Sequence, residues 1–222
     1  MLILALEGAL ARCSAAILRD GAVLAAGRHD APRGHPAILP PLVEQVLAEA
    51  GLKPAALDAV AVGIGPGGFT GLRTAIALAE GLAQALGKPL IGVTTGEALV
   101  AELPEAMRGK GAIWSVLDQR QGRVVLEIFP PGAAMPEAPV ILPIDALPNP
   151  EGAVLLVGDA AEHLAPSLAA RGTQATAHPP ALPSAEAVGL VAARRLAGLL
   201  PPRGAAPLYA EPAATTAPSP AA

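Results

Sequence analysis

The sequence is poor in aromatic residues and contains a single cysteine. Its 222 residues include one Trp, one Tyr and two Phe, whereas hydrophobic residues as a whole make up 52% of the chain. A core must therefore be built mainly from Leu, Val, Ile and Ala. Because Cys13 is the only cysteine, an internal disulfide and a zinc site built on cysteines are both excluded.

Positive charge is scarce as well. Lysine occurs only at Lys53, Lys88 and Lys110, and the formal net charge is −4. Since affinity for nucleic acids depends largely on neutralising phosphates, we expect no direct binding to tRNA or DNA.

No hydrophobic run approaches the ~18 residues of a membrane span, and the N-terminus lacks the basic segment of a signal peptide. The sequence therefore predicts a soluble cytoplasmic protein that does not contact a membrane.

The stretch from residue 59 to residue 89 organises the rest of the chain. The apolar run 59–64 predicts a buried strand, and Gly-Pro-Gly-Gly at 65–68 predicts a tight turn. A helix is expected to follow, with Thr70 as its N-cap and Gly87 at its end. Apolar residues recur along it at helical spacing: Leu72, Ile76, Ala79, Leu82 and Leu86.

The loop in this stretch allows three interpretations. Residues 63–68 match G-x-G-x-x-G between a strand and a helix, which is typical of dinucleotide binding. Pro66, however, removes one amide from the loop, and the pattern follows several strands instead of opening its domain. The three interpretations are therefore a turn without a ligand, an anion or nucleotide site, and a protein contact through Phe69. The candidate anion contacts are Gly65, Gly67, Gly68 and Thr70.

The remaining pattern predicts two α/β halves. Further strands are expected at 2–6, 13–19, 22–28, 90–93, 112–117, 123–129, 140–142 and 154–157. Further helices are expected at 35–50, 95–103, 159–170 and 184–199. In each half the first strand ends in an acid, Glu7 or Asp118. We expect a first subdomain over residues 1–104 joined by the helix 184–200, a second over 111–183, and a disordered tail over 211–222.

At this point the sequence resembles a known family. Residues 65–73 read GPGGFTGLR, which is similar to the GPGSFTGLR signature of the TsaB (YeaZ) family. Other segments resemble the family in the same order: the first strand ending at Glu7, HPAILP at 35–40, IGVT at 91–94 and DQRQGRV at 118–124. The resemblance is strong over residues 1–129 and weaker from residue 130 to Tyr209.

This resemblance implies the actin-like, Hsp70-like ATPase fold, in which two similar α/β subdomains face a cleft. It also implies a function. TsaB-like proteins are non-catalytic dimerisation subunits that work with the catalytic subunit TsaD and the ATPase TsaE. Together these proteins transfer threonylcarbamoyl to the adenosine next to the anticodon of certain tRNAs. The resemblance thus predicts a TsaD-like partner, a TsaE-like ATPase partner and, for the chain alone, a homodimer.

The chain departs from the family where an active member of this fold would need polar groups. It reads Glu7-Gly8-Ala9 where the family has Asp-Thr-Ser or Asp-Thr-Ala, so the threonine hydroxyl is missing. The histidines include no His-x-x-x-His pair, so no metal site is indicated. We therefore expect no catalytic residue, no metal and no cofactor. The alternatives are a nucleotide-binding enzyme, a glycoprotease-like peptidase acting alone, and a small-molecule kinase relative.

Single polar residues have two interpretations each. Glu7 and Asp118 are either paired carboxylates for acid–base work or, as we favour, acceptors for amides at the ends of their strands. Arg120 either meets a partner or a phosphate, or pairs locally with Asp118. His35 is expected to cap a helix or lie at an interface instead of binding a metal.

The mechanism expected from these patterns is helix docking. The helices 35–50 and 70–86 have more apolar or small surface than one sheet face needs, so together they could pack against TsaD or a second copy. The predicted interface residues are His35, Leu39, Leu42, Val46, Phe69, Leu72, Arg73, Ile76 and Ala79. Leu42→Arg or Ala79→Arg is predicted to break the complex and leave the monomer folded.

Overall fold

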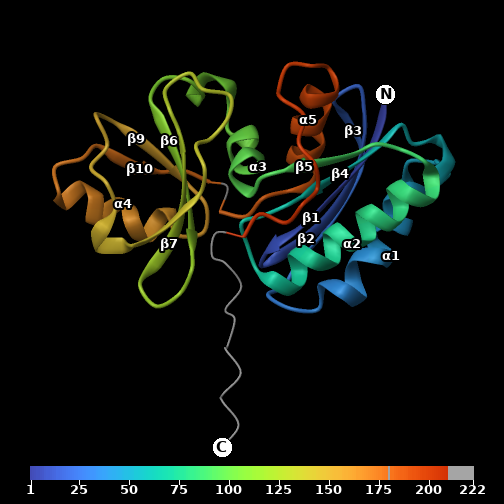
Figure 1. Cartoon of the computed structure of the whole chain (residues 1–222), viewed down its shortest axis with the longest axis horizontal. Coiled ribbons are helices and arrows are strands. Elements are labelled where there is room, and N and C mark those ends of the chain that lie inside the picture. Colours follow the sequence, from blue (N-terminus) through green and yellow to red (C-terminus); the bar gives the residue numbers. More distant parts are fainter. Residues whose placement is uncertain (180, 210–222) are drawn as a thin grey trace, which may run out of the picture.

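Two five-stranded sheets form the framework of the chain, whose computed structural model describes residues 1–179 and 181–209 (Figure 1). The strands of the first sheet are β1 (Leu2–Leu10), β2 (Arg12–Arg19), β3 (Ala22–Asp30), β4 (Ala59–Gly63) and β5 (Leu90–Val93). Those of the second are β6 (Ala112–Asp118), β7 (Arg123–Phe129), β8 (Val140–Pro143), β9 (Val154–Val157) and β10 (Ala175–Ala177). The helices are α1 (His35–Glu49), α2 (Phe69–Leu86), α3 (Thr95–Glu102), α4 (Ala161–Ala170) and α5 (Ala185–Leu196). The tail predicted over 211–222 lies outside the described residues.

Both sheets are built on the same plan. Their strand orders are β3-β2-β1-β4-β5 and β8-β7-β6-β9-β10 when read in the same sense. In each sheet three antiparallel strands are followed by two parallel ones. The prediction of two similar α/β halves is therefore confirmed.

The first sheet is covered by helices on both faces. Successive residues of a strand point to opposite faces, and along β1 Leu4 and Leu6 pack with α1 and α2, whereas Ile3 and Ala5 pack with α3 and α5. We call this sheet with α1, α2 and α5 the first subdomain, and the second sheet with α4 the second subdomain. Since α5 follows the second sheet in the sequence, the first subdomain is assembled from both ends of the chain (Figure 1).

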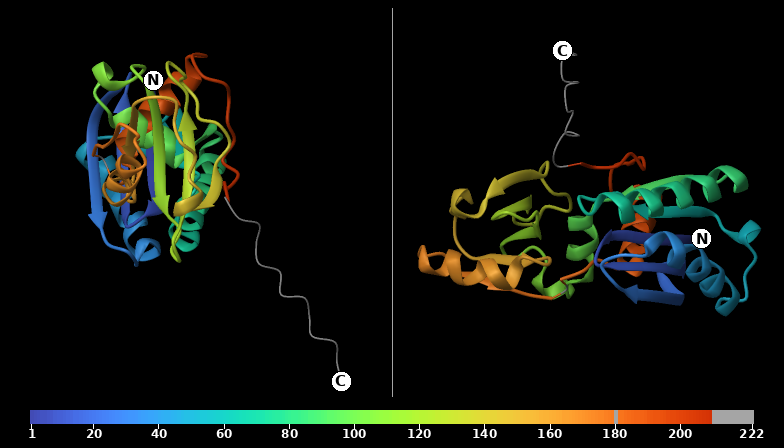
Figure 2. Two further views of the ribbon diagram at one scale, coloured as in Figure 1. Left: turned by 90° about the vertical axis from the view of Figure 1, so that its left-hand side faces the viewer. Right: turned by 90° about the horizontal axis from the view of Figure 1, so that it is seen from below.

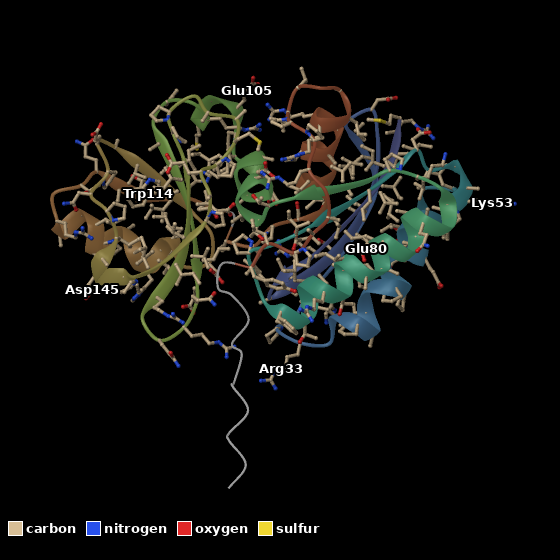
Figure 3. The ribbon with its side chains drawn as sticks, viewed as in Figure 1. Arg33, Lys53, Glu80, Glu105, Trp114 and Asp145 are labelled. Carbon is tan, nitrogen blue, oxygen red and sulfur yellow. The ribbon has the colours of Figure 1, made fainter. Side chains whose placement is uncertain are left out.

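Helix α3 lies between the two subdomains. Ala98 packs into the core of the first, while Leu99 and Leu103 pack against the second sheet. The other face of the second sheet is covered by α4, where Trp114 and Leu164 share a core; Figure 3 labels Trp114. Seen from below, α4 lies at the end of the molecule away from α1 and α2 (Figure 2).

Local sequence signals explain several turns and helix ends. Asp20 and Gly21 have φ of 51° and 84°, as a two-residue hairpin turn between β2 and β3 requires. Thr94 and Glu97 form a reciprocal capping box at the start of α3. Gly87, with φ of 64°, ends α2.

One prediction for the helices is wrong in detail. Gly68 is the N-cap of α2, and no described side chain caps this helix, so Thr70 lies inside the first turn instead of capping it. Helix α1 begins at His35 as predicted, with Pro40 and Pro41 inside it. In the described part of the chain, no helix has the length and apolar character needed to cross a membrane.

After α5 the chain returns across the first subdomain. The backbone N–H of Gly92 donates to Arg203 O at 3.0 Å, and that of Leu208 donates to Ile64 O at 2.8 Å. We call residues 199–209 the C-terminal segment. It passes the ends of β5 and β4 and brings Tyr209 to the start of α2.

Candidate functional site

A cavity of about 900 Å³ opens between the two subdomains. It is lined by the end of β1, the loop before α1, the loop 66–71 at the start of α2 and the turn after β6, with Tyr209 on one side. In α/β folds, ligands bind at the carboxyl ends of the strands, and β1, β4 and β6 all end here. We call this cavity the cleft and treat it as the candidate site.

Glu7 is fully buried next to the cleft. Its Oε1 accepts hydrogen bonds from the backbone N–H groups of Gly8 and Ala9 at 2.7 and 2.5 Å. Its Oε2 has no hydrogen-bond partner among the described residues. A Cβ on Gly63 would lie 1.9 Å from Oε2, so the carboxyl group occupies the space that a side chain there would need. Burial raises the pKa of Glu7 to about 7, against the opposing effect of the two amides.

Three backbone amides next to the cleft are already engaged and do not hold a phosphate. Gly8 and Ala9 donate to Glu7, and Gly68 donates to Ala9 O at 2.6 Å. A Cβ on Gly67 would lie 2.3 Å from the same carbonyl oxygen, so the glycine loop is packed directly onto the end of β1. These contacts leave the loop poorly suited to wrap around a phosphate group.

The four candidate anion contacts do not form one surface. Gly67, Gly68 and Thr70 are exposed and line the cleft. Gly65 is buried, and its carbonyl accepts a hydrogen bond from the backbone N–H of Thr95 at 2.8 Å. Their role in binding an anion remains a prediction.

The raised pKa of Glu7 has a consequence for stability. Because the folded state holds this proton more tightly than the unfolded state, stability falls as the pH rises from 4.5 to about 7. Glu7→Gln removes this loss, which is on the order of 3 kcal/mol. Urea unfolding at about pH 5 and about pH 8 should show a smaller drop for the variant than for the parent. An unchanged drop, or an equal effect of the exposed control Glu80→Gln, would contradict the assignment.

Asp118 and Arg120 lie on the turn that faces the cleft from the second subdomain. Asp118 Oδ1 accepts from the backbone N–H of Arg120 at 2.9 Å, and the backbone N–H of Asp118 donates to Asp159 Oδ1 at 2.8 Å. Burial raises the pKa of Asp159. Glu7 and Asp118 thus each accept amides near the end of their own strand, and Arg120 meets Asp118 through its backbone.

No metal site is visible among the residues that the structure describes. There, no group of three or more His, Cys, Asp or Glu side chains is arranged to hold a metal ion. His35 has a packing role instead. Its Nε2 lies 3.0 Å from Ala31 O, and a Cβ on Gly71 would lie 2.3 Å from its Nδ1. It therefore fixes the start of α1 against the first turn of α2.

Most of the predicted interface residues are buried within the monomer. Seven of them are at most 8% exposed: His35, Leu39, Leu42, Val46, Leu72, Ile76 and Ala79. Their side chains pack between the helices and the first sheet. The prediction that Leu42→Arg or Ala79→Arg leaves the monomer folded is therefore wrong, since both substitutions place a charge in the core.

The outward face of α1 and α2 is different in character. The two helices contact each other, and their exposed residues are largely small: Ala37, Pro41, Gln45 and Ala48 on α1, and Ala77, Gly81, Gln84 and Ala85 on α2. The charged side chains of this face include Glu44 and Glu80, of which Figure 3 labels Glu80. We call this surface the outward helix face. Any contact that α1 and α2 make with another molecule involves these residues first.

Phe69 and Arg73, the two exposed residues of the predicted interface, meet Tyr209. The guanidinium carbon of Arg73 lies 3.8 Å from the ring centroid of Phe69, and Arg73 Nε donates to Tyr209 Oη at 2.6 Å. The two aromatic rings are stacked with centroids 6.0 Å apart. We call these three residues the aromatic–arginine cluster. It stands at the edge of the cleft, at the start of α2.

A buried ionic cluster lies behind the cleft, between the subdomains. Glu97 Oε1 accepts from Arg195 Nη2 at 2.6 Å, with both side chains 2% exposed. Glu127 on β7 accepts from the backbone N–H of Gly96 on α3 at 2.9 Å, and burial raises its pKa to about 7. Sequence reasoning missed this cluster, because Glu97 and Arg195 are 98 residues apart in the chain.

Comparisons with known proteins agree with the architecture. The family model for TsaD, tRNA N6-adenosine threonylcarbamoyltransferase, matches residues 29–125. The Escherichia coli tRNA threonylcarbamoyladenosine biosynthesis protein TsaB is 38% identical over 126 residues, which cover 56% of this chain and 53% of that protein. The match thus spans about half the length of this curated relative.

Solved structures extend the similarity beyond that segment. YeaZ from Pseudomonas aeruginosa, at 26% identity and a TM-score of 0.73, covers 94% of this chain and 99% of its own. The ethanolamine utilization protein EutJ from Carboxydothermus hydrogenoformans, at 12% identity, a TM-score of 0.54 and coverage of 86% and 89%, shares the fold alone. The predicted fold class is confirmed. The chain is therefore a homologue of TsaB (YeaZ) with the two-subdomain, actin-like ATPase fold.

Proposed function

We propose that this chain is a non-catalytic subunit of the complex that transfers threonylcarbamoyl to the adenosine next to the anticodon of tRNA. The observation that carries the proposal is the 38% identity to Escherichia coli TsaB, a tRNA threonylcarbamoyladenosine biosynthesis protein. Its partners in this proposal are a TsaD-like catalytic subunit and a TsaE-like ATPase, and the chain alone forms a homodimer. Such a role places it in the cytoplasm, where tRNA is modified.

The state of the cleft supports a non-catalytic role. In an ATPase of this fold the loop amides must be free to hold phosphate. Here Gly8 and Ala9 donate to the buried Glu7, and Gly68 donates to a neighbouring carbonyl. The residues after β1 also include no hydroxyl until Ser14. We therefore expect no ATP hydrolysis and no peptidase activity from the purified chain.

The outward helix face supports a role in assembly. Small residues such as Ala77 and Gly81 leave the backbone of α2 open to close approach by another helix. The buried predicted residues, such as Leu39 and Ile76, then contribute by holding the two helices in position on the sheet. We propose that the TsaD-like subunit docks here, with helices packed against α1 and α2.

Substitutions on the two sides of α2 should separate folding from assembly. Gly81→Arg meets no atom within 4 Å of its Cβ, so the monomer should remain folded while the TsaD-like subunit binds at least ~10-fold more weakly. Ala79→Arg should instead unfold the chain, because Ala79 is fully buried. Ala169→Arg, on the exposed side of α4, is the matched control and should change neither property.

Reconstitution tests the proposal as a whole. The TsaD-like and TsaE-like proteins of the same genome are mixed with tRNA and threonylcarbamoyl-AMP, with and without this chain, and modified adenosine is measured. We expect modification only when the chain is present. Full activity without it, or turnover of ATP or a peptide by the chain alone, would refute the proposal.

A further inference from the structure

We propose that the aromatic–arginine cluster at the edge of the cleft receives an acidic segment of the TsaD-like partner. This inference rests on the proposed function, because it names a contact of the same assembly. The contact is a carboxylate that binds the guanidinium of Arg73, with a neighbouring apolar side chain that packs on Phe69 and Tyr209. It would extend the outward helix face to the start of α2.

The exposure of these aromatic side chains is the first observation. The chain has only four aromatic residues. Phe129 and Trp114 are both 2% exposed, as expected for core residues, whereas Phe69 is 57% and Tyr209 is 40% exposed. Half of the aromatic residues are thus placed together on the surface. Tyr and Arg are the residue types that most often dominate the binding energy of protein interfaces.

The second observation is that Arg73 is held in place but has no acidic partner among residues 1–179 and 181–209. Its guanidinium stacks on Phe69, and its Nε is bonded to Tyr209. No carboxylate of the described residues forms an ion pair with it. A guanidinium fixed in this way can bind a carboxylate through two hydrogen bonds with little loss of side-chain freedom.

Charge around the cleft favours the same kind of ligand. Arg33, on the loop before α1, and Arg120, on the turn after β6, also line it (Figure 3 shows Arg33). Among the described residues, Asp118 is the one acid that lines this cavity, and its Oδ1 already accepts the backbone N–H of Arg120. The edge therefore carries an excess of positive charge on a chain whose net charge is −4. Complementary charge steers and selects an acidic partner.

A peptide carboxylate fits this surface better than a nucleotide does. A nucleotide in the cleft would need free amides for its phosphates, and three of the amides there, those of Gly8, Ala9 and Gly68, are engaged. Arg73 and Phe69 also lie one turn apart on α2, in line with Ala77 on the outward helix face. A partner docked on that face would reach the cluster without entering the cleft.

The chain contains a built-in reporter for this contact. Tyr209 is its single tyrosine, so selective labelling with carbon-13 tyrosine gives one side-chain resonance set that needs no assignment. We expect it to shift when the purified TsaD-like subunit is added to the full-length chain. Arg73→Gln should weaken binding of that subunit about tenfold, with an unchanged monomer by circular dichroism. Arg194→Gln, on the exposed side of α5, is the matched control and should bind like the parent.

The outcomes separate this inference from the proposed function. If the complex forms and Gly81→Arg weakens it, but the Tyr209 resonances do not move, the contact is wrong and the assembly stands. If no complex forms under any condition, both proposals fail. If ATP or a short single-stranded RNA moves the resonances and the TsaD-like subunit does not, the cluster binds nucleotides and the acidic segment is refuted.

Discussion

Replacing Gly63 by alanine is expected to lower the free energy of unfolding by at least ~3 kcal/mol. The new Cβ would lie 1.9 Å from Oε2 and 2.7 Å from the carboxyl carbon of Glu7. Neither partner can move easily, because Gly63 is buried in β4 and the other carboxyl oxygen of Glu7 is bonded to two amides. Urea unfolding followed by circular dichroism at a fixed pH measures the loss.

A double-mutant cycle assigns this loss to the carboxyl group. In a Glu7→Ala background the clash is absent, so adding Gly63→Ala should cost less than ~1 kcal/mol. Gly81→Ala, where the Cβ meets no atom within 4 Å, is the glycine control and should stabilise the helix slightly. Equal losses for Gly63→Ala in both backgrounds would show that the packing of Glu7 is not the cause.

The second large effect is expected at the buried ionic cluster. Arg195→Leu should cost about 3 kcal/mol, because it leaves the buried Glu97 without its closest cation. Arg203 Nη2 lies 3.8 Å from the same carboxylate, beyond hydrogen-bond distance, and Glu127 adds a second acid nearby. Urea unfolding should show a larger loss at about pH 8 than at about pH 5, since Glu127, with a pKa of about 7, is ionised only at the higher pH.

Two variants test this explanation. Arg195→Leu combined with Glu97→Gln should recover part of the lost stability, because no uncompensated buried charge remains on Glu97. Arg194→Leu changes the neighbouring exposed residue and should stay within ~0.5 kcal/mol of the parent. A loss below ~1 kcal/mol for Arg195→Leu would mean that the ion pair contributes little to the fold.

The features predicted correctly from the sequence depend on residues that are close together in the chain. The close spacing of the strands predicted at 13–19 and 22–28 and the end of α2 at Gly87 are each decided within a few residues. The two-halves plan was visible because each half repeats a strand, an acid and a hairpin. The start of α2 was misplaced because Thr70 offers a capping oxygen, whereas Gly68, packed on the end of β1, sets the actual boundary.

The sequence pattern could not show which face of α2 is exposed to a partner. Helical spacing reveals that Leu72, Ile76 and Ala79 share a face, but it does not say whether that face meets the sheet or another protein. In the structure this face packs against the first sheet. The outward surface of the helix consists of small residues, such as Ala77 and Gly81, whose pattern does not indicate a hydrophobic face.

The buried polar groups could not be predicted for a related reason. Arg195 and Glu97 are 98 residues apart, and no local pattern connects them. The prediction that Glu7 accepts hydrogen bonds from nearby amides is confirmed. Its burial against Gly63, which raises its pKa, depends on β1 and β4 being neighbours in the sheet. Tertiary pairing, not local propensity, thus decides the electrostatics of the candidate site.

The return of α5 and the C-terminal segment to the first sheet has a consequence for biosynthesis. The ribosome finishes the second sheet before it has made the helix that covers one face of the first. Until α5 has been made, Ile3, Ala5 and Leu18 of the first sheet are covered on that side only in part, by α3, whereas the second sheet can already close its own core. We expect protease protection of ribosome-bound chains to appear first in the middle of the sequence and to reach β1 only after α5 has emerged.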